Sequence, residues 1–163
     1  FTAISSPHLD GFARLRMDPS SCQAEASKYM AEFIASDAET KLLDADAAGL
    51  RRIYEALAAS DREAYVSLFS DRALLGAGLN WYRANLAPDS MRAAIGPVRV
   101  PTLQIWSDGD IAICRDTAEL TREFMAGPYR LEVIEGAAHW VPELASTRVN
   151  QLLREHFAQH PAP

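Results

Sequence analysis

Two stretches in the last third of the chain have the hydrophobic pattern of buried strands. Residues 100–106 form a largely apolar run, and residues 130–134 form a shorter one. Between them, residues 115–125 carry apolar side chains at helical spacing, which predicts a helix. Strands that alternate with helices along a chain indicate a parallel sheet covered by helices. The pattern therefore predicts an α/β fold for this part of the chain.

The middle of the chain has a different pattern. From Leu9 to about Leu86, β-branched residues are scarce, and Ala, Glu, Arg and Leu predominate. Apolar residues recur there at helical spacing, and Ser20, Asp37 and Asp61 stand where helix N-caps are expected. This pattern predicts a block of helices without strands.

Together the patterns divide the chain into three segments. Residues 1–8 begin with a run of strand formers that ends at Pro7. Residues 9–87 are predicted to form the helical block. Residues 88–163 are predicted to return to the sheet with two strands and their helices.

Composition excludes several classes of function. The chain has 163 residues, of which 48% are hydrophobic, and a formal net charge of −6. An acidic chain without basic clusters is not expected to bind nucleic acid or an anionic membrane surface. Its two cysteines, Cys22 and Cys114, lie far apart in sequence and predict no disulfide framework. They are compatible with a reducing compartment, so a cytoplasmic location is expected.

An acid and a histidine stand in the turns that follow the two C-terminal strands. Asp110 follows the strand at 100–106, and His139 follows the strand at 130–134. Parallel strands place both turns at the same carboxyl edge, where open α/β sheets bind their ligands. A carboxylate that orients an imidazole is part of a nucleophilic triad. Taken singly, Asp110 or Asp108 would be interpreted as a turn former, and the pairing with His139 favours catalysis.

The other chemical signals are fewer. Tyr82 could pack as an ordinary aromatic residue or donate its hydroxyl proton to a substrate oxygen. The sequence shows no metal-ligand spacing, so no metal and no cofactor are predicted. It contains no Gly-x-Ser-x-Gly and no equivalent with Asp or Cys, so it supplies no recognisable nucleophile.

Four stretches resemble the second half of an alpha/beta-hydrolase of the epoxide hydrolase and haloalkane dehalogenase branch. They are the strand that ends in Pro-His at residues 1–8, the segment 27–33, the Asn-Trp-Tyr-Arg segment within 79–83, and the acid and His turns. The resemblance implies the C-terminal half of an alpha/beta-hydrolase fold with an inserted helical lid. Residues 1–8 would be the core strand after the nucleophile elbow, 9–87 the lid, and 88–163 the rest of the core.

The resemblance also implies roles for particular residues. His139 would activate the hydrolytic water, Asp110 would orient His139, and Tyr82 would polarise the substrate oxygen. Three further aromatic residues would bind the substrate: Tyr29, Trp81 and Trp140. Relatives use two lid tyrosines, but Glu32 stands at the first of these positions, and Tyr29 is the nearest substitute.

These roles predict a hydrolase that acts on a small, rather apolar substrate through a covalent enzyme intermediate, most similar to an epoxide hydrolase. The nucleophile would come from an N-terminal half, which is the expected partner. An Asp nucleophile would favour epoxides or haloalkanes, and a Ser nucleophile would favour esters. The alternatives are therefore an esterase or haloalkane dehalogenase of the same fold, or a non-catalytic binding member. A homo-oligomer is compatible with the sequence.

Overall fold

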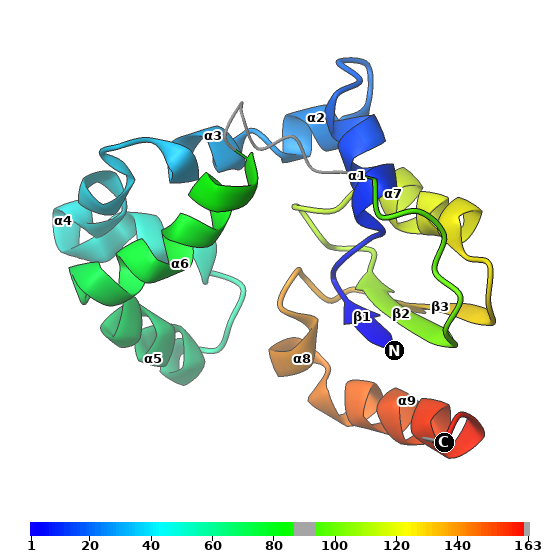
Figure 1. Ribbon diagram of the computed structural model, residues 1–163. Coiled ribbons are helices and arrows are strands. Elements are labelled where there is room, and N and C mark those ends of the chain that lie inside the picture. Colours follow the sequence, from blue (N-terminus) through cyan, green and yellow to red (C-terminus); the bar gives the residue numbers. More distant parts are fainter. Residues whose placement is uncertain (87–93, 162–163) are drawn as a thin grey trace. The chain divides into compact units, whose positions relative to one another are not determined.

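The computed structural model describes residues 1–86 and 94–161, which form two compact units (Figure 1). One unit comprises Phe1–Ser27 and Ala94–Pro163, and the other comprises Lys28–Ala93.

The first unit contains a parallel sheet in the order β1-β2-β3. Its strands are β1 (Thr2–Ile4), β2 (Thr102–Ser107) and β3 (Tyr129–Ile134). All six residues of β2 are buried, because the central strand of a parallel sheet is covered on both faces. The predicted α/β organisation and the positions of the strands are confirmed.

Helices cover both faces of this sheet (Figure 1). They are α1 (Leu9–Arg16), α2 (Cys22–Ala26), α7 (Arg115–Leu120) with the 3-10 turn η1 (Thr121–Phe124), α8 (Val141–Leu144) and α9 (Ser146–Gln159). Leu103 and Ile105 pack against Val141 of α8 and Leu152 of α9. Trp106, which points to the opposite face, packs with residues of α1 and α7. The alternation of side chains along β2 thus builds two separate cores.

The second unit consists of helices α3 (Tyr29–Ile34), α4 (Ala38–Ile53), α5 (Ala59–Phe69) and α6 (Arg72–Leu86). Helix α4 is interrupted at 44–47, where Ala45, Asp46 and Ala47 have positive φ angles. The buried apolar residues of the unit include Leu42, Leu50, Val66, Leu75 and Leu79. The predicted helical block is therefore present as a unit with its own core.

The helical unit begins later than the predicted lid. Residues 9–27 were expected in the lid, but α1 and α2 belong to the sheet-containing unit. The reason is packing, since α1 contacts α7 and Gly11 leaves room for the ring of Phe124. The predicted boundary between residues 87 and 88 lies outside the described residues.

The expectation for the two cysteines was wrong. Cys22 and Cys114, which are 92 residues apart in sequence, form a disulfide with their Cα atoms 6.2 Å apart. The fold brings α2 beside the loop after β2, and sequence separation alone cannot predict such an approach. In the described part of the chain, every helix is too short or too polar to span a bilayer.

Candidate active site

Asp110 and His139 meet where β2 and β3 end. The imidazole Nδ1 of His139 lies 2.9 Å from each carboxylate oxygen of Asp110. The Asp110 side chain is fully buried, whereas that of His139 is 31% exposed. The predicted hydrogen bond is therefore present, and it joins a buried acid to a histidine that solvent can reach.

This geometry selects one tautomer of His139. An ionised carboxylate only accepts hydrogen bonds, so Nδ1 carries the hydrogen and donates it to Asp110. In the neutral ring, Nε2 then holds a lone pair on the side turned away from the acid. A group held in this way can accept a proton from a water molecule or a hydroxyl group.

The loop that carries Asp110 is folded around the acid itself. The Oδ1 atom of Asp110 accepts hydrogen bonds from the backbone N–H groups of Ala112, at 2.8 Å, and Ile113, at 3.0 Å. Asp110 therefore also forms the turn that Asp residues often form. Because the turn and the contact with His139 use the same side chain, the turn fixes the direction of the carboxylate.

Polar side chains also join the acid turn to the His turn. Asp108 accepts a 2.7 Å hydrogen bond from the N–H of Gly136, which has φ = +71°. The hydroxyl of Ser107 donates to the carbonyl of Ala138 at 3.0 Å. A side chain at Gly109 would collide with the carbonyl of Ala137, so only glycine fits there.

Two further residues support His139. The hydroxyl of Ser5, just after β1, donates to the backbone carbonyl of His139 at 2.8 Å. The ring of Trp140 lies edge-on to the imidazole, with 5.3 Å between ring centroids. Trp140, predicted to bind substrate, is thus beside the histidine in the first unit.

The other predicted site residues lie together in the helical unit. Tyr82 on α6 forms a side-chain hydrogen bond with Tyr29 on α3. Phe33 packs edge-on against both rings, with 5.1 Å between centroids in each case. Trp81 also lies edge-on to Tyr82 and is 56% exposed. The structure therefore gathers Tyr29, Trp81 and Tyr82 into one aromatic cluster.

Burial further favours the protonated form of the Tyr82 hydroxyl. Desolvation raises the pKa of Tyr82 above its ordinary value of 10.0, and the hydrogen bond with Tyr29 lowers it to a lesser extent. A phenol that stays protonated can donate a hydrogen bond to a substrate oxygen. Glu32, which the sequence resemblance places at the first lid-tyrosine position, is exposed, and Tyr29 is the residue beside Tyr82.

An ion pair holds the helix of Tyr82 in place. Arg83 donates to both carboxylate oxygens of Glu39, at 2.7 and 2.9 Å, and to the carbonyl of Ala35. The hydrogen bonds from Arg83 are the main reason that the pKa of Glu39 falls to about 2. A two-point contact of this kind fixes orientation as well as distance. Sequence analysis missed this role of Arg83, although the charge lies next to Tyr82 in the sequence.

No metal-binding cluster of His, Cys, Asp and Glu occurs among residues 1–86 and 94–161. The predicted site residues thus form two groups, one in each unit. Asp110, His139 and Trp140 make up the first group, and the aromatic cluster makes up the second.

Comparisons with known proteins point to one branch of hydrolases. No family model matches the chain. It is 27% identical over 129 residues to human epoxide hydrolase 4, covering 77% of this chain and 35% of that protein. It is also 27% identical over 111 residues to epoxide hydrolase 3 of Xenopus tropicalis, covering 68% and 30% respectively. The chain thus spans about a third of the length of the curated relatives it matches.

Solved structures agree on the fold. An epoxide hydrolase from Bacillus megaterium superposes with a TM-score of 0.74 at 18% identity, covering 96% of this chain and 60% of the other. An epoxide hydrolase from hot-environment metagenomes gives a TM-score of 0.76 at 21% identity, covering 98% and 59%. The chain therefore has an alpha/beta-hydrolase fold, fits the C-terminal half of that fold, and is similar in sequence to epoxide hydrolases.

Proposed function

We propose that this chain supplies the base, the orienting acid and a tyrosine-bearing cap to an epoxide hydrolase. The proposal rests on one observation: the buried carboxylate of Asp110 accepts a hydrogen bond from Nδ1 of His139, whose side chain solvent can reach. The aromatic cluster of the helical unit adds two phenol hydroxyls, from Tyr29 and Tyr82, that hydrogen-bond to each other. Together with a nucleophile, a base, an orienting acid and phenol donors can hydrolyse an epoxide through a covalent ester.

The proposed reaction has two steps. A carboxylate nucleophile attacks an epoxide carbon, the carbon–oxygen bond breaks, and the Tyr82 hydroxyl donates its proton to the oxygen that is released. Water then attacks the ester carbonyl while Nε2 of His139 takes a proton from that water. The ester bond breaks, and His139 returns this proton to the departing alkoxide, so that the neutral diol leaves. The second proton of the water remains on the nucleophile's carboxyl group and passes to solvent, and the Tyr82 phenolate regains a proton from solvent, which restores both groups. Asp110 stabilises the charged imidazole in the second step.

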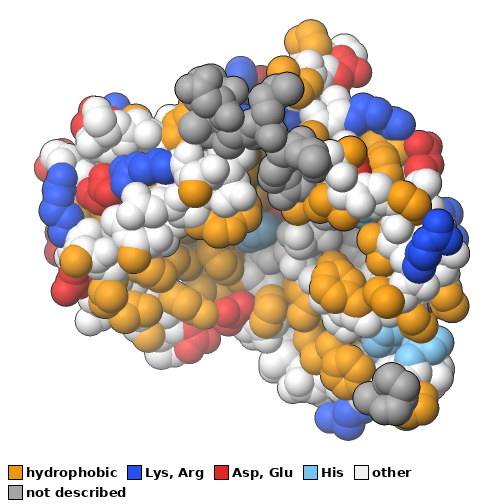
Figure 2. All heavy atoms as spheres, viewed as in Figure 1, with side chains coloured by type: hydrophobic (Ala, Val, Ile, Leu, Met, Phe, Trp, Pro, Cys, Tyr) orange, Lys and Arg blue, Asp and Glu red, His pale blue; other side chains and the backbone are white. Residues whose placement is uncertain are grey.

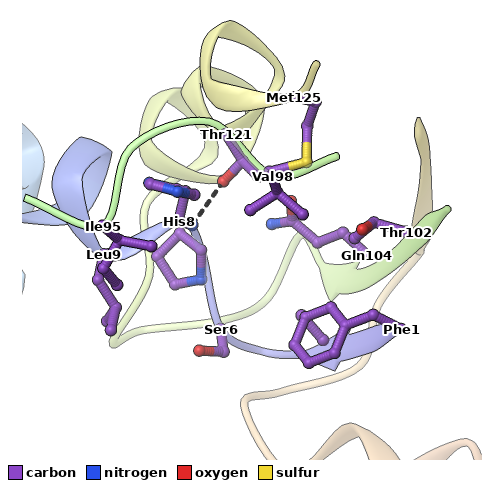
Figure 3. Close-up of a pocket in the computed structure, with 12 residues that line it drawn as sticks. Phe1, Ser6, His8, Leu9, Ile95, Val98, Thr102, Gln104, Thr121 and Met125 are labelled. Atoms are coloured by element: carbon purple, nitrogen blue, oxygen red, sulfur yellow. Dashed lines mark hydrogen bonds between the residues drawn. The ribbon is translucent and has the colours of Figure 1, made fainter. Parts of the chain in front are cut away.

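The nucleophile belongs to an N-terminal half in this proposal. The chain itself contains no nucleophile motif. The sheet offers support for such a partner, since β1 is at the edge of the described strands. Beside it lies a mostly apolar pocket of about 220 Å³, between Phe1, His8 and Gln104 (Figure 3).

Exposed hydrophobic side chains also support such a partner. They reach the surface of the chain (Figure 2), and those of Phe1 and Val100 are more than half exposed. An N-terminal half that completes the sheet would cover such side chains.

The experiment uses the intact protein that contains this chain. His139→Ala should accumulate a covalent adduct on the nucleophile when it is treated with a small aryl epoxide, detected as a mass increase equal to the epoxide. His160→Ala, an exposed histidine on the C-terminal tail, serves as the control and should turn over normally. An adduct that forms only with an ester substrate in the unmutated protein would instead identify an esterase. No adduct and no turnover with epoxides, haloalkanes or esters would favour a binding member of the fold.

The cellular compartment is a separate proposal. The expectation of a cytoplasmic location rested partly on two unpaired cysteines, and the Cys22–Cys114 disulfide removes that support. Disulfides persist mainly in oxidising compartments. We therefore propose that the protein functions in an oxidising compartment, in which this disulfide persists. Thiol labelling of the protein taken directly from its cells tests this proposal.

A homo-oligomer stays a prediction, and light scattering of the intact protein would test it.

A further inference from the structure

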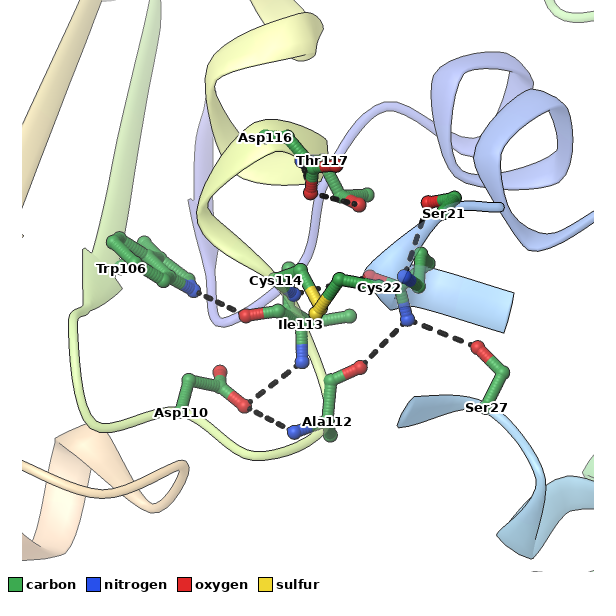
Figure 4. The surroundings of a disulfide bond; sticks show 11 residues. Ser21, Cys22, Ser27, Trp106, Asp110, Ala112, Ile113, Cys114, Asp116 and Thr117 are labelled. Atoms are coloured by element: carbon green, nitrogen blue, oxygen red, sulfur yellow. Dashed lines mark hydrogen bonds between the residues drawn. A yellow bond between two sulfur atoms is a disulfide. The ribbon is translucent and has the colours of Figure 1, made fainter. Parts of the chain in front are cut away.

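Gln23 on α2 is a fully buried amide that contacts the loop carrying Asp110. Figure 4 shows this loop with Asp110, Ala112 and Cys114. Its Nε2 donates to the carbonyl of Ala112 at 2.8 Å and to the hydroxyl of Ser27 at 2.9 Å. Its Oε1 accepts from the N–H of Cys114 at 3.1 Å. Both ends of the amide are therefore engaged, and two of the three bonds go to the backbone of one loop, residues 108–114, here named the acid loop.

These bonds hold the same peptide groups that hold Asp110. In the peptide group between Ala112 and Ile113, the carbonyl of Ala112 accepts from Gln23 and the N–H of Ile113 donates to the Asp110 carboxylate. In the following peptide group, the carbonyl of Ile113 accepts from the indole of Trp106 at 3.0 Å and the N–H of Cys114 donates to Gln23. The direction of the carboxylate thus depends on peptide groups that are hydrogen-bonded to two buried side chains, Gln23 of α2 and Trp106 of β2.

The disulfide marks the same junction without replacing Gln23. Cys22 precedes Gln23, and Cys114 is the residue whose N–H bonds to Gln23. A disulfide limits how far α2 and the acid loop can separate, but it leaves the peptide planes between Asp110 and Cys114 able to rotate. The amide of Gln23 fixes the orientation of those peptide planes. Its donor and acceptor are a fixed distance apart, so both hydrogen bonds form only when the carbonyl of Ala112 and the N–H of Cys114 point toward the amide.

We propose that Gln23 is a positioning residue that aims the Asp110 carboxylate at His139. The expected loss of activity rests on the proposed function. The positioning of the Asp110 carboxylate rests only on the contacts of Gln23. Without the amide, the carbonyl of Ala112 and the N–H of Cys114 would lose these hydrogen bonds inside the protein. Because unpaired buried groups are unfavourable, we expect the loop to shift so that water can bind them. A shift of the loop moves Asp110 with it.

The test compares two variants of the intact, disulfide-bonded protein. Gln23→Met keeps the length of the side chain and removes both bonds to the acid loop. Ser27→Ala is the matched control, because it removes only the third bond of Gln23 and leaves the acid loop contacts intact. The direct readout is the proton NMR resonance of the His139 Nδ1–H, which a hydrogen bond to a carboxylate shifts strongly downfield.

The expected result is that Gln23→Met loses or broadens this resonance while Ser27→Ala keeps it. In kinetics, Gln23→Met should lower kcat by about 10²-fold, because a small misplacement of a catalytic group costs that much. The ratio kcat/KM should change little, because Asp110 and His139 act on the covalent intermediate in the second step. Gln23→Glu is the second variant if Gln23→Met does not fold, since it keeps the shape and the acceptor for Cys114 but not the donor for Ala112. It too should weaken the resonance.

The two proposals can fail separately. An unchanged Nδ1–H resonance in a folded Gln23→Met or Gln23→Glu protein would overturn the positioning role, whatever the activity. Equal losses in Gln23→Met and Ser27→Ala would also overturn it, because they would indicate general loosening of the core. If the unmutated protein shows the resonance but no hydrolase activity, the proposed function fails and the NMR comparison still tests Gln23.

Discussion

Asp108 and Gly136 are joined by a 2.7 Å hydrogen bond from the glycine N–H to the carboxylate, across the two turns at the end of the sheet. This bond separates the roles of two aspartates that the sequence leaves equivalent. Asp108 ties one turn to the other, and Asp110, two residues later, contacts the imidazole of His139. The distinction leads directly to a mutational test.

Replacing Asp110 by Asn should abolish most of the turnover of the intact protein. An amide can donate to Nδ1 and so favours the wrong tautomer of His139, with the hydrogen on Nε2. We expect kcat to fall by roughly 10²–10⁴-fold, as is usual when an orienting acid is lost. The measurement is steady-state hydrolysis of an aryl epoxide together with a thermal melt.

Asp108→Asn is the control for this prediction. The amide oxygen of the substituted side chain can still accept from the N–H of Gly136, so the turns stay joined and the activity should change little. A larger kinetic loss in the Asp108 variant than in the Asp110 variant would reverse the assignment of the acid.

The hydroxyl pair in the aromatic cluster should matter for epoxide opening and not for stability. Tyr82→Phe and Tyr29→Phe keep the rings that pack against Phe33 and remove one donor each. Loss of a positioned proton donor should slow formation of the covalent adduct by about 10²-fold. Rapid-quench mass spectrometry of the adduct measures this step alone.

Tyr65→Phe, at a ring that stacks on Tyr54 elsewhere in the helical unit, is the matched control. It should leave adduct formation unchanged. If Tyr82→Phe also leaves the rate unchanged, the phenol pair has a packing role and Tyr82 is not the proton donor for epoxide opening.

The ion pair between Glu39 and Arg83 should make the helical unit sensitive to acid. Hydrogen bonds from Arg83 lower the pKa of Glu39 from 4.5 to about 2 in the folded chain. A carboxylate with a depressed folded-state pKa stabilises the fold above the unfolded-state value and loses that effect as the pH falls through the folded-state value. Stability should therefore decline between about pH 4.5 and pH 2, and circular dichroism melts across this range measure it.

Glu39→Gln should flatten this decline and lower stability at neutral pH. Glu123→Gln removes the exposed pair between Glu123 and Arg14, in which both side chains are more than half exposed, and is the control. Exposed pairs contribute little, so this variant should follow the unmutated chain at every pH. Identical acid profiles for all three proteins would mean that Glu39 is not the titrating group.

Reducing the disulfide should destabilise the chain. Cys22 and Cys114 close a loop of 92 residues, and bonds that close long loops restrict the unfolded chain most. We expect a loss of roughly 2–4 kcal/mol in the free energy of unfolding, measured by denaturant titration with and without reductant. The Cys22→Ala and Cys114→Ala double variant should match the reduced protein and show no further response to reductant.

The sequence by itself determined the order of the elements and the two residues, Asp110 and His139, that are proposed as acid and base. The apolar runs at 100–106 and 130–134 are local signals, and the turns that follow them carry Asp110 and His139. Parallel pairing of such strands places both turns at one edge, so a general property of sheets was enough to predict their contact. The same local reasoning predicted the helical block, because helical periodicity requires no knowledge of distant residues.

Only the tertiary structure decided which surfaces these elements share. Helical periodicity records that one face is buried but not against which partner, so α1 and α2 were expected in the lid and lie with the sheet. Gln23, Cys22 and Cys114 acquire their roles only when α2 packs beside the acid loop, which is far away in sequence. Likewise, Tyr29 is a partner of Tyr82 because α3 packs on α6. Such contacts depend on long-range packing, which the pattern of one segment does not contain.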